Sequence, residues 1–139
     1  MHVQAVIKKK SQEEQALGRS KGGFTTKIHA LVDALGLPIR FILTSGQSSE
    51  IKQAPKLIQG IKRANILGDT VFDSDEFINQ IIPQNCKAII PPRSNRKVQR
   101  EVNYYLYRER HLIECFFAKV KHFRQIWTPR ITCSRVVCY

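Results

Sequence analysis

Acidic residues are scarce in this chain, and that shortage indicates what kind of partner it binds. The 139 residues include 11 Asp or Glu against 23 Lys or Arg, which gives a formal net charge of +12. A balance this basic favours a polyanionic partner, with nucleic acid ahead of an anionic membrane. The positive charge is concentrated in residues 93–130, which hold ten Lys or Arg and three Glu.

Other absences exclude whole classes of protein. No apolar run approaches the roughly 20 residues that a transmembrane helix needs. The first ten residues carry their lysines after the apolar stretch, unlike a secretory signal. The four cysteines form no Cys-x-x-Cys pair, so a zinc ribbon is not indicated. His111, Cys115 and His122 share one flank of a predicted helix, but three ligands on one helix rarely complete a tetrahedral site.

Hydrophobic residues make up 42% of the chain, enough for the core of one domain. Alternating and short apolar segments predict strands, and amphipathic segments predict helices, which together favour an α/β fold. The first two strands are joined by a turn with Gly and Pro, as in an antiparallel hairpin. Strands are predicted over residues 25–33, 39–44, 64–68 and 88–90, and helices over residues 50–62, 75–82 and 107–124.

The helix predicted over residues 107–124 carries two stripes of side chains. At about 100° per residue, Tyr107, Arg110, Glu114 and Lys121 share one narrow stripe. An acid bracketed by bases suits a metal-binding carboxylate beside a polyanion, although a solvated helix face can have the same composition. The apolar arc expected to face the core contains Leu112, Ile113, Phe116, Phe117, Val120 and Phe123.

The spacing Tyr-x2-Arg-x3-Glu-x6-Lys in this stripe resembles the signature of DDE-type insertion-sequence transposases, which have an RNase H-like catalytic domain. Residues 66–75 are similar to the family's strand that ends in Asp-x-Gly-(Tyr or Phe). Asp69 stands at the aspartate of that pattern, and Val71 departs from it where the family has glycine. Residues 22–29 and 91–97 resemble the family's second core strand and its basic loop.

The resemblance covers about residues 17–125 and implies an RNase H-like α/β fold, a mixed sheet with flanking helices. It divides the chain into a basic and polar N-terminal segment at residues 1–19, a partial catalytic domain at 20–125 and an irregular tail at 126–139. The implied activity is metal-dependent cleavage and strand transfer of transposon ends in DNA transposition and recombination. The implied partners are transposon-end DNA and target DNA, with a homo-oligomer as a further possibility and no membrane partner. The implied location is the bacterial cytoplasm, in association with the nucleoid.

The resemblance also assigns roles to single residues. Asp69 and Glu114 would be the catalytic carboxylates and the ligands of Mg²⁺ or Mn²⁺, with two ions in an intact enzyme. The residues implied to bind DNA are Tyr107, Arg110 and Lys121 in the helix, and Arg93, Arg96 and Lys97 in the basic loop.

Two metal ions need at least three carboxylates, and the family's third lies on the first core strand. No Asp or Glu occurs in residues 1–12. Asp33 falls at the predicted hairpin turn, where an aspartate usually caps the backbone. Asp73 and Asp75 are expected to cap the following helix, with Ser74 as the alternative to Asp75. We therefore expect a chain truncated at both ends, which lacks most of that first strand and is inactive.

A missing first strand has a structural consequence as well. That strand is central in an RNase H-like sheet, so residues 64–69 would be left with an open edge. Residues 2–7, an apolar stretch, are expected to fill the gap in part.

Three functions follow from these observations. The first is a truncated, inactive transposase catalytic domain. The second is a non-catalytic DNA-binding remnant that competes with or regulates an intact transposase. A third carboxylate close to Asp69 and Glu114 would favour the catalytic domain over this remnant. The third, a basic RNA-binding protein, is disfavoured because the aromatic residues lie mostly in the core arc of the helix.

Overall fold

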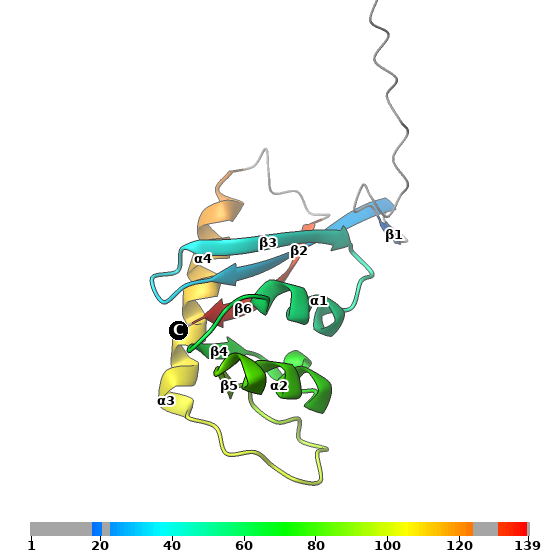
Figure 1. The fold of residues 1–139 in the computed structure, drawn as a ribbon. Coiled ribbons are helices and arrows are strands. Elements are labelled where there is room, and N and C mark those ends of the chain that lie inside the picture. The colour runs from blue at the N-terminus through cyan, green and yellow to red at the C-terminus, as the bar shows by residue number, and fades with distance from the viewer. Residues whose placement is uncertain (1–17, 21–22, 124–130, 139) are drawn as a thin grey trace, which may run out of the picture.

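The computed structural model describes residues 18–20, 23–123 and 131–138. One mixed sheet forms the centre of the fold, in the order β1-β2-β6-β4-β5, with β3 paired to β2 (Figure 1). Its strands are β1 (Gly18–Ser20), β2 (Gly23–Val32), β3 (Pro38–Ser45), β4 (Asn65–Gly68), β5 (Lys87–Ile89) and β6 (Ile131–Cys138).

Helices cover both faces of the sheet. Figure 1 shows α1 and α2 on one face and α4 crossing the other. The helices are α1 (Glu50–Ile58), α2 (Asp75–Ile81), α3 (Tyr104–Tyr107) and α4 (His111–Lys121), with 3-10 turns η1 (Thr70–Phe72), η2 (Ile82–Gln84) and η3 (Arg108–Arg110). The predicted α/β class, with a mixed sheet and flanking helices, is confirmed. Among the described residues no helix is long and apolar enough to cross a membrane.

The sheet separates two hydrophobic cores, as the alternation in β2 predicts. Leu31 points to the side of α1 and α2, where it packs with Val136 of β6. Ala30 and Val32 point the other way, into a cluster with Val137 and with Ile113 of α4. The predicted antiparallel hairpin is confirmed, because β2 pairs with β3 from Thr26 opposite Ser45 onwards.

Strand β6 overturns the expectation of an irregular tail at residues 126–139. It lies between β2 and β4, parallel to the first and antiparallel to the second. Val136 and Val137 are both buried, one in each core. A strand that is covered on both faces need not alternate in polarity, which explains why its pattern was missed. Residues 126–130 and 139 lie outside the described residues.

The same strand corrects the expectation of an open edge beside residues 64–69. Ile66 and Gly68 of β4 pair with Cys138 and Val136, so β4 has neighbours on both sides. The central position that the resemblance assigns to the first core strand is therefore occupied by β6. The expectation that residues 2–7 fill this gap falls outside the described residues.

The long helix begins earlier than predicted and is interrupted. The Asn103 side chain accepts hydrogen bonds from the backbone N–H groups of Tyr105 and Leu106, so helical structure starts at Tyr104. The 3-10 turn η3 separates α3 from α4, and α4 ends at Lys121. Phe123, expected in the core arc, lies beyond the helix and is 64% exposed.

Asp33 caps the hairpin turn, as predicted. Its Oδ1 accepts hydrogen bonds from the N–H groups of Leu35 (2.8 Å) and Leu37 (2.9 Å). Gly36 in the same turn has a φ of +76°, a conformation that a residue with a Cβ rarely adopts. Asp33 therefore has the turn-forming role that its position in the sequence indicated.

The position of β6 makes a prediction about stability. Val137→Asp places an unpaired carboxylate in the core beneath α4, and we expect it to lower the free energy of unfolding by at least about 3 kcal/mol. Urea denaturation measures this loss. The matched control, Val98→Asp, alters a residue that is 73% exposed and should change stability by less than about 0.5 kcal/mol. Equal stability of the two variants would show that β6 does not lie in the sheet.

His29 predicts a dependence of stability on pH. Its ring is fully buried, shares a hydrogen bond with the Thr44 hydroxyl (2.7 Å), and has a pKa lowered to about 4 by burial and, less, by the charge of Lys27. The unfolded chain takes up the proton first, so stability should fall as pH drops from about 6.5 to 4, by up to about 3 kcal/mol. Urea unfolding across this range should show a steeper loss in the unmodified chain than in His29→Gln. Equal slopes would contradict the prediction.

Candidate nucleic-acid interface

Asp69 directly follows β4, at the carboxyl end of this buried strand. Its Oδ1 accepts a hydrogen bond from the Val71 N–H at 3.1 Å and so caps η1. This turn brings the Phe72 ring over Gly68, where a Cβ would stand only 3.0 Å from the ring. Glycine before Asp69 therefore lets the chain turn sharply at the end of the strand.

Glu114, on α4, is held by two arginines. Its Oε1 lies 3.0 Å from Arg110 Nη2, one turn away on the same face, and 3.6 Å from Arg135 Nη1 on β6. The Glu114 side chain is 44% exposed, so solvent screens these contacts. The carboxylate is still accessible, but positive charge flanks it from the helix and from the sheet.

Strand register places Arg135 next to Asp69 as well. Gly68 pairs with Val136, so the next position along each strand brings Asp69 beside Arg135. Arg135 and Val137 point to the same face, because side chains two residues apart in a strand share a face. That face is covered by α4. Arg135 therefore contacts Glu114 and, by strand register, stands opposite Asp69.

Contacts link the predicted DNA-binding residues into a row along α3, η3 and α4. The rings of Tyr104 and Tyr107 meet edge-on at 6.2 Å, and Arg110 Cζ lies 5.6 Å from the Tyr107 ring centre. Arg110 then pairs with Glu114. Lys121 is exposed two helical turns further along α4. The structure thus keeps the four residues of the sequence stripe on one helical unit and adds Tyr104 to them.

The basic loop after β5 is fixed to the fold by Asp73. This carboxylate is buried and accepts hydrogen bonds from the Arg93 N–H (2.7 Å), from Arg96 Nε (3.1 Å) and from the Arg100 guanidinium. Asp75 pairs with Arg96 and Arg100 from the first turn of α2. Of the residues expected to cap α2, Ser74 holds the N-cap position, although its side chain makes no capping hydrogen bond. The capping role expected of the two aspartates is wrong, because the arginines engage both carboxylates.

The arginines also set the charge state of Asp73. Burial alone would raise the pKa of this carboxyl group, but the hydrogen bonds from Arg93, Arg96 and Arg100 outweigh it and hold the pKa below its ordinary value. Asp73 therefore stays ionised at neutral pH, and its contribution to stability is lost only as the pH falls below about 4.

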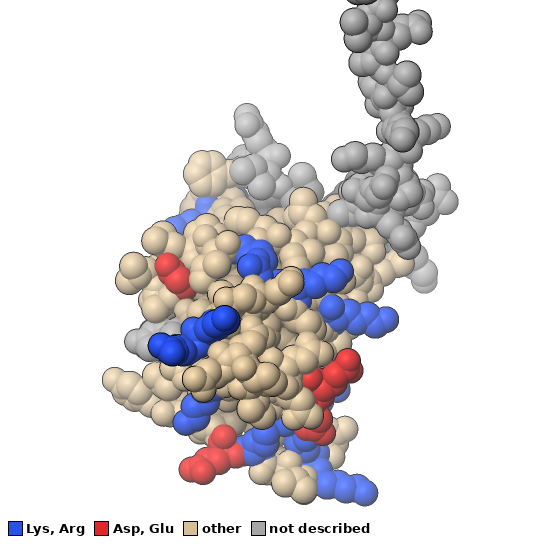
Figure 2. All heavy atoms as spheres, viewed as in Figure 1, with Lys and Arg blue, Asp and Glu red and all other residues tan. Residues whose placement is uncertain are grey.

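The three residues of this loop that are predicted to bind DNA differ in their contacts with the rest of the protein. The Arg96 guanidinium lies on Asp73 and Asp75. The Arg93 side chain is exposed but donates to the carbonyl oxygens of Thr70 and Val71. Lys97 is exposed at the outside of the loop. In Figure 2, Lys and Arg are spread over the face that carries α1 and α2, among fewer acidic residues.

The carboxylates of the described residues do not match a two-metal site. No group of three or more His, Cys, Asp or Glu side chains is placed to hold a metal ion in this part of the chain. Asp69 uses one oxygen to cap η1, and Glu114 is paired with arginines. Two hard cations need several oxygen ligands without competing positive charge.

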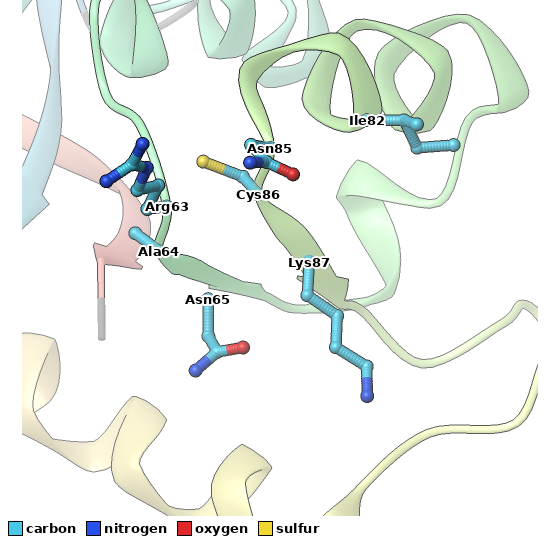
Figure 3. Close-up of a pocket in the computed structure, with 7 residues that line it drawn as sticks. All are labelled: Arg63, Ala64, Asn65, Ile82, Asn85, Cys86 and Lys87. Atoms are coloured by element: carbon cyan, nitrogen blue, oxygen red, sulfur yellow. The ribbon is translucent and has the colours of Figure 1, made fainter.

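A cavity of about 550 Å³ opens at the other end of the central strands (Figure 3). It lies where β4 and β5 begin and is lined by Arg63, Ala64, Asn65, Ile82, Asn85, Cys86 and Lys87. None of the predicted site residues borders it. In Figure 3 the Arg63 and Lys87 side chains extend in different directions rather than converging on one point.

Comparison with known proteins now decides the family. The sequence profile described as "Transposase DDE domain" matches residues 6–138. The chain belongs to the DDE transposase family. A Brucella ovis protein named as a transposase for insertion sequence element IS6501 is 40% identical over 105 residues, which cover 73% of this chain and 80% of the relative. No solved structure gives a match.

Within this family member, sequence reasoning predicted where some of the candidate site residues lie in the fold and missed others. It placed Asp69 after a buried strand and Glu114 with Tyr107 and Arg110 on one helix face, which the structure bears out as positions. It missed Arg135, because nothing in the local sequence indicates that the last strand enters the sheet. It also missed the Asp73 network, although the position of an aspartate after a strand and a run of arginines could have suggested an ion-pair cluster.

The Asp73 network makes a testable prediction. Asp73→Asn removes the buried charge that holds three groups of the basic loop, and we expect the free energy of unfolding to fall by about 2 kcal/mol at neutral pH. The matched control is Asp75→Asn, whose carboxylate side chain is 72% exposed and should matter by less than about 0.5 kcal/mol. Urea denaturation compares them, and equal effects would show that Asp73 does not anchor the loop.

Proposed function

We propose that this DDE transposase family member binds DNA through the row on α3, η3 and α4 and does not cut it. The main support is the position of Arg135, a cation that contacts Glu114 and, by strand register, stands opposite Asp69. The family uses divalent metal ions, and a metal-binding carboxylate has to be free of competing cations. Strand β6 occupies the central position that the resemblance gives to the strand of the first aspartate, and its sequence contains Arg135 and no aspartate.

DNA binding is supported by charge and by geometry. Arg110 and Lys121 are cations on one face of a helix, and Tyr107 adds a hydroxyl beside them. Such groups bind the phosphate backbone without reading sequence. Lys97 of the basic loop is a further exposed cation. A chain with these contacts and no cleavage would occupy sites that an intact transposase needs, and so compete with it.

The second candidate function is metal-dependent cleavage and strand transfer of transposon ends, with Mg²⁺ or Mn²⁺. It is favoured by the partial exposure of Glu114 and by the nearness of Asp69 to the same edge of the sheet. It requires a third carboxylate to join these two.

Nicking of supercoiled DNA separates the two functions. We expect the purified chain to show no nicking above background with Mg²⁺ or Mn²⁺, and no difference from Glu114→Gln. Metal-dependent nicking that Glu114→Gln abolishes would contradict the proposal and favour the catalytic function.

Binding to a duplex is measured on the same preparations by fluorescence anisotropy at several salt concentrations. Lys121→Ala and Lys97→Ala should each weaken binding and reduce the slope of log K against log salt by about one. Lys62→Ala, at an exposed position before the start of β4, is the control and should leave the slope unchanged. No salt-sensitive binding by the unmodified chain would overturn DNA binding itself.

A further inference from the structure

Strand β3 leaves a row of large apolar side chains uncovered. Ile39, Phe41 and Leu43 are 44%, 49% and 58% exposed. Phe41 and Leu43 pair with Ala30 and Ile28 of β2, and paired residues point to the same face of a sheet. Both partners belong to the cluster beneath α4, so the β3 row lies on the α4 side of the sheet.

Helix α4 crosses the hairpin near the start of β3 and covers this row only in part (Figure 1). It packs on β2 and β6, and its nearest aromatic contact to β3 is Phe116, whose ring centre lies 5.7 Å from that of Phe41. Leu35 and Leu37, in the turn before β3, extend the uncovered surface with exposures of 78% and 57%. We call these five residues the β3 patch: Leu35, Leu37, Ile39, Phe41 and Leu43.

The patch is among the larger apolar patches that a single chain exposes. With a large apolar residue taken as roughly 170–200 Å² when fully exposed, the five side chains offer about 500 Å². Contiguous apolar patches of this size mark interaction sites. A stable interface buries about 800 Å² on each partner, of which a little over half is apolar. The β3 patch supplies that apolar share.

The backbone of β3 is also open to a partner. Within the described residues β3 pairs only with β2, so its other edge carries unpaired N–H and C=O groups. Proteins usually blunt such an edge with outward charges or proline. The charged residue of β3, Arg40, points to the opposite face, where its Nη1 donates to the carbonyl oxygens of Lys56, Leu57 and Gln59. Pro38 is the first residue of β3 and removes a backbone N–H only there. The remaining residues of the strand keep an edge with which another strand can pair.

We propose that a second copy of this chain pairs its β3 with this β3 in antiparallel register, which joins the two sheets about a two-fold axis. A two-fold axis perpendicular to the sheet and passing at Phe41 keeps each side chain on its own face. Phe41 then faces Phe41 of the second copy, and Ile39 faces Leu43. The edge gains backbone hydrogen bonds, and an uncharged row meets an uncharged row in a chain of net charge +12. A self-complementary surface of this kind closes as a dimer.

Sedimentation or light scattering on the nuclease-treated full chain, over a range of concentrations at high salt, tests this dimer. The unmodified chain should be dimeric at micromolar concentration. Phe41→Lys should be monomeric, with the dissociation constant raised at least about 100-fold, because like charges would face each other across the strands. Val98→Lys, at an exposed position in the basic loop and outside the patch, should remain dimeric. Circular dichroism verifies that both variants stay folded.

A mixture of variants identifies the partner. Phe41→Glu alone should also be monomeric, whereas mixing it with Phe41→Lys should restore a dimer, since opposite charges would then meet. A monomeric unmodified chain, a dimeric Phe41→Lys variant, open-ended oligomers, or failure of the mixture to reassociate would each overturn the proposal. The test does not involve DNA, so its outcome is independent of the proposed DNA binding.

Discussion

Backbone hydrogen bonds from β6 to both β2 and β4 connect the two halves of the sheet. Without β6, the hairpin of β2 and β3 would have no bonded link to β4 and β5. Val136 and Val137 fill the cores on opposite faces, so this strand also connects the layer of α1 and α2 with the layer of α4. The two predicted catalytic carboxylates depend on this strand, since Asp69 directly follows β4, which pairs with β6, and Glu114 contacts Arg135 of β6.

The same strand determines the electrostatics of the candidate site. Arg135 brings a second cation to Glu114, which already pairs with Arg110. Positive charge that attracts a DNA phosphate also competes with a metal ion for a carboxylate. The Asp73 cluster uses a different arrangement, in which a buried carboxylate binds arginines and fixes the loop. Arginines in this chain therefore have two roles, and their number alone does not indicate how many are available to DNA.

Prediction from sequence succeeded where the pattern is local and failed where it depends on neighbours. The alternation in β2 and β3 defined the hairpin, and the turn role of Asp33 followed from its position. Helix α1 ended at Ile58 rather than residue 62, where the chain leaves the helix before Gly60, whose φ is +81°. Strand β6 was missed because a strand buried on both faces does not alternate, and its apolar residues gain a partner only when β2 and β4 are already in place.

The sequence by itself determined the α/β class, the basic character, the family resemblance, and the placement of Tyr107, Arg110, Glu114 and Lys121 along one helical face. These follow from composition and from the geometry of single helices and strands, in which the spacing of two residues determines whether their side chains share a face. Only the tertiary structure decided which strand is central, that Arg135 contacts Glu114, and that the apolar row of β3 lies uncovered. These features depend on residues far apart in sequence, and their proximity is set by packing of the whole sheet rather than by any local pattern.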